Sequence, residues 1–247
     1  MTRRATAIVF ALSVALVSVP AQIAFAQDFS LSLGDDGSLT ARGLQLILLI
    51  TVLSLAPGIA VMVTCFPFIV TVLSILRQAL GLQQSPPNML IVTLALFLTY
   101  FVMEPVFQAA WQSGIQPVLN EEIEIEAGFQ RTLEPFRVFM AARVEAETFA
   151  AMADLRGATE LAAPSPEAPA SILIPSFLLS EMSRAFQIGF LIFLPFLIID
   201  LVVAAILMSM GMMMVPPAIV SLPFKLAFFV VADGWALISS SLVRGYF

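Results

Sequence analysis

The chain has 247 residues, of which 60% are hydrophobic and only 11% are charged. Soluble domains average about 25% charged residues, so this composition excludes an ordinary soluble domain and indicates a membrane protein. The net charge of −6 argues against nucleic-acid binding, which needs a basic surface. The absence of histidine removes the commonest general base and metal ligand, and Cys65 has no cysteine to pair with. We therefore expect no metal site and no cofactor.

The first 26 residues have the pattern of a cleaved signal peptide. Arg3 and Arg4 precede a short apolar segment at 8–19, and the tripeptide Ala-Phe-Ala at 24–26 has the small-x-small pattern of a cleavage site. Cleavage after residue 26 predicts a bacterial-type export route and an N-terminus outside the cytoplasm. The alternative is an uncleaved signal anchor.

The next part of the chain predicts an exposed lead-in at 27–43 and a first helical hairpin at 44–111. Residues 44–76 are almost wholly apolar and exceed the roughly 20 residues that a straight helix needs to span a bilayer. We expect Pro57-Gly58 and Pro67 to break this run into a kinked or two-part helix. A second apolar helix is predicted at 88–107.

A more polar insert is predicted at 112–175 and a second helical hairpin at 176–247. Four glutamates at 121–126 form a cluster that we interpret as a solvated face, and a helix is expected at 129–155. Proline and alanine at 162–175 predict an irregular linker. The predicted fold class is therefore an all-α membrane protein, with two long kinked helical hairpins and a small, mostly helical soluble insert. Four crossings would place both tight turns inside and the insert outside.

Three charged residues lie within the second hairpin: Asp200, Lys225 and Asp233. A charge in a membrane-length segment costs at least about 2.5 kcal/mol and usually faces a bundle interior or a conduit. The two aspartates lack the Tyr-Asp and Gly-x-Gly-Asp contexts of intramembrane aspartyl proteases, so catalysis is disfavoured. We predict a buried ion pair or an assembly contact, with a proton or cation role as the alternative. Lys225 is the expected ion-pair partner, because Lys225 and Asp233 can both face the interior of one helix bundle. Either Lys225 or Asp233 can then pair with Asp200.

Glu181 and Arg184 stand at i and i+3 just before the long apolar run of the second hairpin. Such a pair stabilises a helix by about 0.2–0.5 kcal/mol. We predict an ordinary helix pair that can equally face a neighbouring subunit during assembly.

The turn of the second hairpin is rich in methionine. The string MSMGMMMVPP runs from Met208 to Pro217 and contains Met210, Met212, Met213 and Met214. Methionine specifies packing weakly, so it is a poor core filler, but its unbranched thioether repacks easily. We interpret the turn as a deformable seal in a passage, with lipid-facing or core filler as the alternative.

Four long strings carry a family resemblance: Val72–Asn88, Ala95–Val106, Leu179–Pro217 and Ser221–Trp235. In these strings the chain resembles the FliP family of flagellar biosynthesis, which shares its fold with SctR-type proteins of virulence type III secretion. The resemblance implies a non-enzymatic core subunit of the flagellar type III protein export gate in the bacterial inner membrane, at the flagellar basal body. It also implies a pentamer-like homo-oligomer with FliR- and FliQ-like membrane subunits, FlhB- and FlhA-like export proteins, and unfolded flagellar substrates. The family's methionine constriction falls on residues 212–214.

Two positions depart from the family pattern. Phe66-Pro67-Phe68 replaces a common Phe-Thr-Arg, and Ser183 stands where a basic residue is common. The signal peptide and the long insert favour a flagellar system over a virulence system. From the residues alone, a small-solute or proton-coupled transporter is the other alternative.

Overall fold

The computed structural model describes residues 39–82, 86–158, 163–212 and 214–247. The predicted signal peptide, most of the lead-in and Met213 lie outside the described residues. Contacts divide the chain into two units, 1–51 and 52–247. Every regular element in the described ranges is a helix, which confirms the predicted all-α class.

Helix α2, Leu39–Met62, is the first described element. Its apolar side chains are exposed along most of its length. Pro57 lies inside this helix, so the predicted break at Pro57-Gly58 is wrong. The chain leaves the helical path at 63–65 instead, just before Pro67 at the start of the next helix. Proline is favoured there because N–H groups in the first turn of a helix have no intrahelical acceptor, so the N–H group that proline lacks is not needed.

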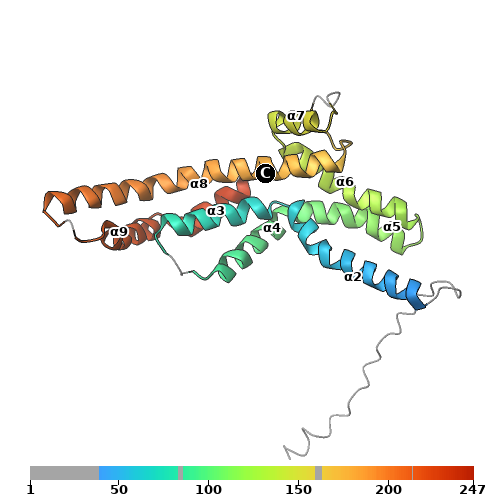
Figure 1. Cartoon of the computed structure of the whole chain (residues 1–247), viewed down its shortest axis with the longest axis horizontal. Helices are drawn as coiled ribbons and strands as arrows, with labels where there is room; N and C mark the ends of the chain where they lie inside the picture. The colour runs from blue at the N-terminus through green and yellow to red at the C-terminus, as the bar shows by residue number, and fades with distance from the viewer. Residues whose placement is uncertain (1–38, 83–85, 159–162, 213) are drawn as a thin grey trace, which may run out of the picture. The chain divides into compact units, whose positions relative to one another are not determined.

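Helix α3, Phe66–Ala79, is at the centre of the larger unit. It packs against α4 and α8, and lies beside α8 in Figure 1. Gly189 of α8 permits this approach, because a Cβ atom there would come within 2.4 Å of the Cδ1 atom of Ile75. The side chains that α3 buries are Phe68, Ile69, Val72, Leu73, Leu76 and Ala79.

Helix α4, Asn88–Ala110, continues through a π-helical turn, η1, at Trp111–Ile115 into α5, Gln116–Leu119. This helical segment is longer than the predicted 88–107. It packs on the insert through two glycines: a Cβ atom on Gly114 would lie 2.7 Å from the carbonyl oxygen of Gly128. Residues 114 and 128, both within the predicted insert, thus approach each other closely at the backbone.

The insert contains α6, Ile125–Arg143, and α7, Ala146–Leu155, so the single helix predicted at 129–155 is in fact two. Helix α8, Ala170–Ser209, begins inside the stretch that composition predicted to be irregular. The reason is tertiary: the first turns of α8 bury Ile172, Leu173 and Phe177 in a second core with α6 and α7. That burial favours helix through Pro175, despite the hydrogen bond that a proline removes.

Helices α9, Pro217–Val231, and α10, Gly234–Arg244, form a broken pair. Their axes are bent by 61° at residues 232–233. Asp233 lies at the bend with a left-handed backbone, φ 48°. The final apolar run is therefore not one straight helix.

Three helical stretches in the described ranges are long and apolar enough to cross a membrane: Gly43–Met62, Asn88–Leu119 and Ala170–Ser209. The α9–α10 pair is a fourth if it counts as one broken span. These helices are consistent with the membrane class that composition predicts. The orientation of the four predicted crossings stays a prediction.

Candidate functional site

The second hairpin carries two polar clusters. The Lys225 cluster consists of Asp200, Ser221, Lys225 and the main-chain carbonyl of Ala79. The Lys225 Nζ atom donates to Asp200 Oδ2 at 2.6 Å and to the Ala79 oxygen at 3.0 Å. Ser221 Oγ donates to Asp200 Oδ1 at 2.5 Å. The side chain of Lys225 is 7% exposed and that of Asp200 is 32% exposed.

This arrangement ties three helices together. The last carbonyls of a helix lack intrahelical partners, and Lys225 on α9 satisfies the one at Ala79 of α3. A cation is also favoured at the negative end of a helix dipole. Asp200 on α8 neutralises the ammonium charge, so the pair that joins α8 and α9 also fixes both to α3.

Asp233 does not join the Lys225 cluster. Its side chain is exposed, and it forms no ion pair with any residue that the structure describes. The suggested contact with Lys225 fails because the left-handed residue at the α9–α10 bend turns the backbone away from a common helix face. The carboxyl group of Asp233 is therefore exposed in this single chain, without an ion-pair partner among the described residues.

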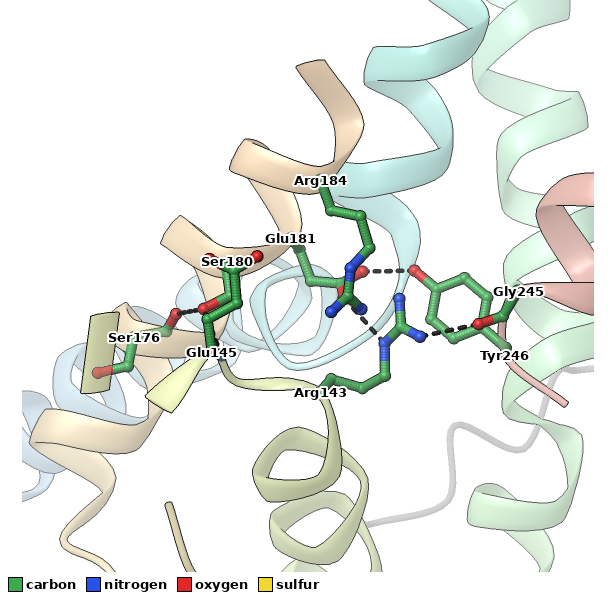
Figure 2. Close-up of polar contacts among 8 residues, drawn as sticks. All are labelled: Arg143, Glu145, Ser176, Ser180, Glu181, Arg184, Gly245 and Tyr246. Atoms are coloured by element: carbon green, nitrogen blue, oxygen red, sulfur yellow. Dashed lines mark hydrogen bonds and ion pairs between the residues drawn. The ribbon is translucent and has the colours of Figure 1, made fainter. Parts of the chain in front are cut away.

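The second cluster surrounds Glu181 (Figure 2) and consists of Arg143, Glu181, Arg184 and Tyr246. Glu181 is fully buried. Its Oε1 atom lies 3.0 Å from Arg143 Nε and 3.6 Å from Arg184 NH1. The hydroxyl of Tyr246 donates to Oε2, the other carboxylate oxygen. The predicted i, i+3 pair of Glu181 with Arg184 is present, but Glu181 has a nearer partner in Arg143, 38 positions away in the sequence.

Tyr246 is enclosed by aromatic rings and an arginine. Its ring lies edge-on to Phe68 at 5.6 Å and stacks on Phe139 at 6.1 Å, and the Arg143 Cζ atom lies 4.1 Å from its centroid. Arg143 also donates to the carbonyl of Gly245 at 2.8 Å. Burial, and next the negative charge of Glu181, raise the pKa of Tyr246 above its usual value. The phenol therefore stays protonated and serves as a donor.

Two serines extend this contact from α8 to the insert. The backbone N–H of Glu145, at the start of α7, donates to Ser180 Oγ at 3.0 Å. Ser180 in turn donates to the carbonyl of Ser176 at 2.8 Å. The Glu181 region is thus where the insert, α8 and the residues after α10 meet.

The two clusters are well separated along α8. A rise of 1.5 Å per residue places Asp200 about 28 Å from Glu181 along the helix axis. This is close to the roughly 30 Å thickness of a bilayer's hydrocarbon core. No charged residue lies between Arg184 and Asp200. The polar clusters therefore bracket one apolar length of helix.

The methionine turn connects α8 and α9. Gly211 adopts φ 75°, which L side chains rarely adopt, and its N–H donates to Met208, so glycine ends the helix here. Met210 is 67% exposed, Met212 is 41% exposed and Met214 is 98% exposed. Met210 and Met212 also border an apolar hollow of about 520 Å³ between α8 and α9. The turn thus presents thioether side chains that the single chain does not pack.

Cys65 is fully buried at the start of α3. Burial raises the pKa of its thiol to about 12, so the reactive thiolate is suppressed. No group of three or more acidic or cysteine side chains in the described ranges could hold a metal ion. Neither observation indicates a reactive thiol or a metal-binding site in the described ranges.

Sequence reasoning found the charges of the Lys225 cluster but missed Arg143 and Tyr246. Tyr246 contacts Glu181 across 65 positions, and no local spacing carries that information. The only available signal was rarity, since Tyr246 is one of two tyrosines in the chain.

Comparison with known proteins gives one consistent result. The sequence model of the FliP family matches residues 49–242. The flagellar biosynthetic protein FliP of Caulobacter vibrioides is 46% identical over 99% of this chain and 91% of its own length. The proteins of the same name from Bacillus subtilis and Aquifex aeolicus are 43% and 45% identical, each over 82% of this chain and over 91% and 85% of their own lengths.

Proposed function

The chain belongs to the FliP family, and from this membership we propose that it is a core subunit of the flagellar type III protein export gate. In this role it forms part of the channel through which unfolded flagellar proteins are secreted, and it is required for flagellum assembly. The observation that carries the proposal is the match to a flagellar biosynthetic protein along 99% of this chain. The role is conduction and not catalysis.

The proposed location is the bacterial inner membrane at the flagellar basal body, with the insert in the periplasm. The contacts of Arg143 with the Gly245 carbonyl and the Tyr246 ring support a common side for the insert and the residues after α10. The Lys225 cluster, about 28 Å away along α8, supports an opposite side for the methionine turn.

The proposed assembly is a pentamer-like ring with FliR- and FliQ-like subunits, which works with FlhB- and FlhA-like proteins. Apolar side chains are exposed along α2 and α8 and at the bend after α9, more than a monomer in water tolerates. Lipid or neighbouring subunits would cover them. Asp233 is the proposed charged assembly contact, because its exposed carboxylate in a membrane-length segment requires a polar neighbour.

The proposed seal consists of Met210 and residues 212–214. A passage for unfolded chains must close against ions and still admit any side chain. Met210 and Met214 are largely exposed in the single chain and so are available to meet copies of themselves. Flexible thioethers repack at low cost when a substrate passes.

Gene deletion tests the proposal. A deletion strain should lose swimming and secrete no flagellar subunits, and the wild-type gene should restore both. A strain that still assembles flagella but lacks secretion of virulence proteins would favour the virulence alternative. Solute uptake by the purified chain, together with normal flagella in the deletion strain, would favour the transporter.

A further inference from the structure

The Glu181 cluster closes the base of the hairpin that carries the methionine turn. Glu181 precedes the long apolar part of α8, and Tyr246 follows α10. Their hydrogen bond therefore joins the two ends of a segment that contains the rest of α8, the turn, α9 and α10. Figure 2 shows Tyr246 and Arg143 converging on Glu181.

Apart from this contact, α10 is held by apolar packing: Leu242 is buried, Ile238 and Val243 are half-buried against the core, and Trp235 lies edge-on to Phe229. The pair α9–α10 is bent by 61°, and most of the side chains of α10 are at least partly exposed. Of its own residues only Gly234 and Leu242 are buried. The strong polar contacts near its end belong to the two residues that follow it, Gly245 and Tyr246.

The contact is also costly to leave open. Glu181 has no exposed surface, and the Tyr246 hydroxyl is the one described donor to its Oε2 atom, so loss of that hydroxyl leaves a buried carboxyl oxygen without a described partner. Arg143 alone reaches three members of this site: Glu181, the Gly245 carbonyl and the Tyr246 ring. This strongly favours the closed arrangement.

We propose that Tyr246 is a positioning residue for the methionine turn, acting as a latch that pins the end of α10 to Glu181 and Arg143. With the latch closed, both ends of the hairpin are fixed and the Lys225 cluster fixes its middle, so the turn has one resting position. With the latch open, α10 is held only by apolar packing, and the turn loses that position. This inference rests on the proposed export function.

Tyr246→Phe tests the latch because it keeps the packed ring and removes only the hydroxyl. Tyr100→Phe is the matched control: Tyr100 is the other tyrosine, is exposed, and keeps its stacking on Phe107. Hydrogen exchange of residues 234–247 in the detergent-solubilised protein should become about 10-fold to 100-fold faster in Tyr246→Phe, as expected for losing a hydrogen bond to a charged group. It should be unchanged in Tyr100→Phe.

Ion leakage in cells is the second measurement, since a purely structural contact would not alter it at normal complex yield. Tyr246→Phe should raise leakage several-fold while the complex assembles at the wild-type level. Unchanged exchange would overturn the latch, and faster exchange with no leak would overturn the link to the turn. If Tyr246→Phe fails to accumulate, Glu181→Gln, which keeps the shape and removes the charge, must show the same pair of changes. Failure of the proposed export function can be told apart from failure of the latch. If the export function is wrong, the deletion strain keeps its flagella, whatever the hydrogen-exchange rates of the variants.

Discussion

Replacing Lys225 by methionine should destabilise the chain, because it removes the cation of the ion pair that joins α8 and α9. Methionine keeps most of the length of the side chain and removes only the ammonium group. The Ala79 carbonyl then loses its donor and Asp200 loses its cation. Ser221 remains as the one described donor to the Asp200 carboxylate.

The expected loss in the free energy of unfolding follows from the exposed fractions of the Lys225 and Asp200 side chains. Breaking a fully buried ion pair costs about 3–5 kcal/mol because a charge is left uncompensated. Asp200 is 32% exposed, so water replaces part of the lost interaction. We therefore expect Lys225→Met to lower the free energy of unfolding by about 2–3 kcal/mol. Asp200→Asn should cost at least as much, because the charge that it strands belongs to the more deeply buried Lys225.

Thermal unfolding in mild detergent measures the single variants and the double variant, and the coupling energy between Lys225 and Asp200 should be about 1–2 kcal/mol. Asp233→Asn is the control: it removes a charge from the same hairpin but keeps a residue type that tolerates the left-handed backbone. In the isolated chain, where no assembly partner meets Asp233, its cost should stay below about 0.5 kcal/mol. A coupling energy near zero, or a larger cost for Asp233→Asn than for Lys225→Met, would refute the assignment of Asp200 as the partner.

Three further outcomes are expected. Alanine at all of residues 212–214 should leave the complex assembled but leaky to ions or dyes, whereas an ion-tight variant with normal export would return these methionines to filler. Gly189→Ala should cost about 1–3 kcal/mol in thermal unfolding, because its Cβ atom would meet Ile75 at 2.4 Å, while Gly58→Ala, with nothing within 4 Å, should not destabilise α2. Cys65 should resist maleimide in the folded protein and react once it is denatured, because burial raises the pKa of its thiol from 9.0 to about 12. The contribution of this burial to stability should be full below pH 9.0 and should be lost as pH rises toward 12, because the unfolded chain loses the thiol proton first. Rapid labelling of the folded protein would contradict the burial.

The sequence alone determined the class of the protein and its family. Apolar runs of membrane length predict helices because a helix satisfies all the polar groups of the backbone within one segment, where the bilayer offers no hydrogen-bond partners. The same logic singled out Asp200 and Lys225, since a charge in such a run needs a partner. The long strings around residues 179–217 and 221–235 identified the family without any knowledge of contacts.

Tertiary structure decided the partners. Whether Lys225 meets Asp200 or Asp233 depends on how α8, α9 and α10 cross, and a 61° bend is not encoded in the spacing of two residues. The sequence shows Glu181 only as one half of a helix pair. In the folded chain Glu181 is the centre of a buried cluster, because Arg143 and Tyr246, 38 and 65 positions away in the sequence, contact its carboxyl group. Local patterns report on neighbours within one or two helical turns, whereas the free energy of a buried charge depends on every chain segment that packs around it.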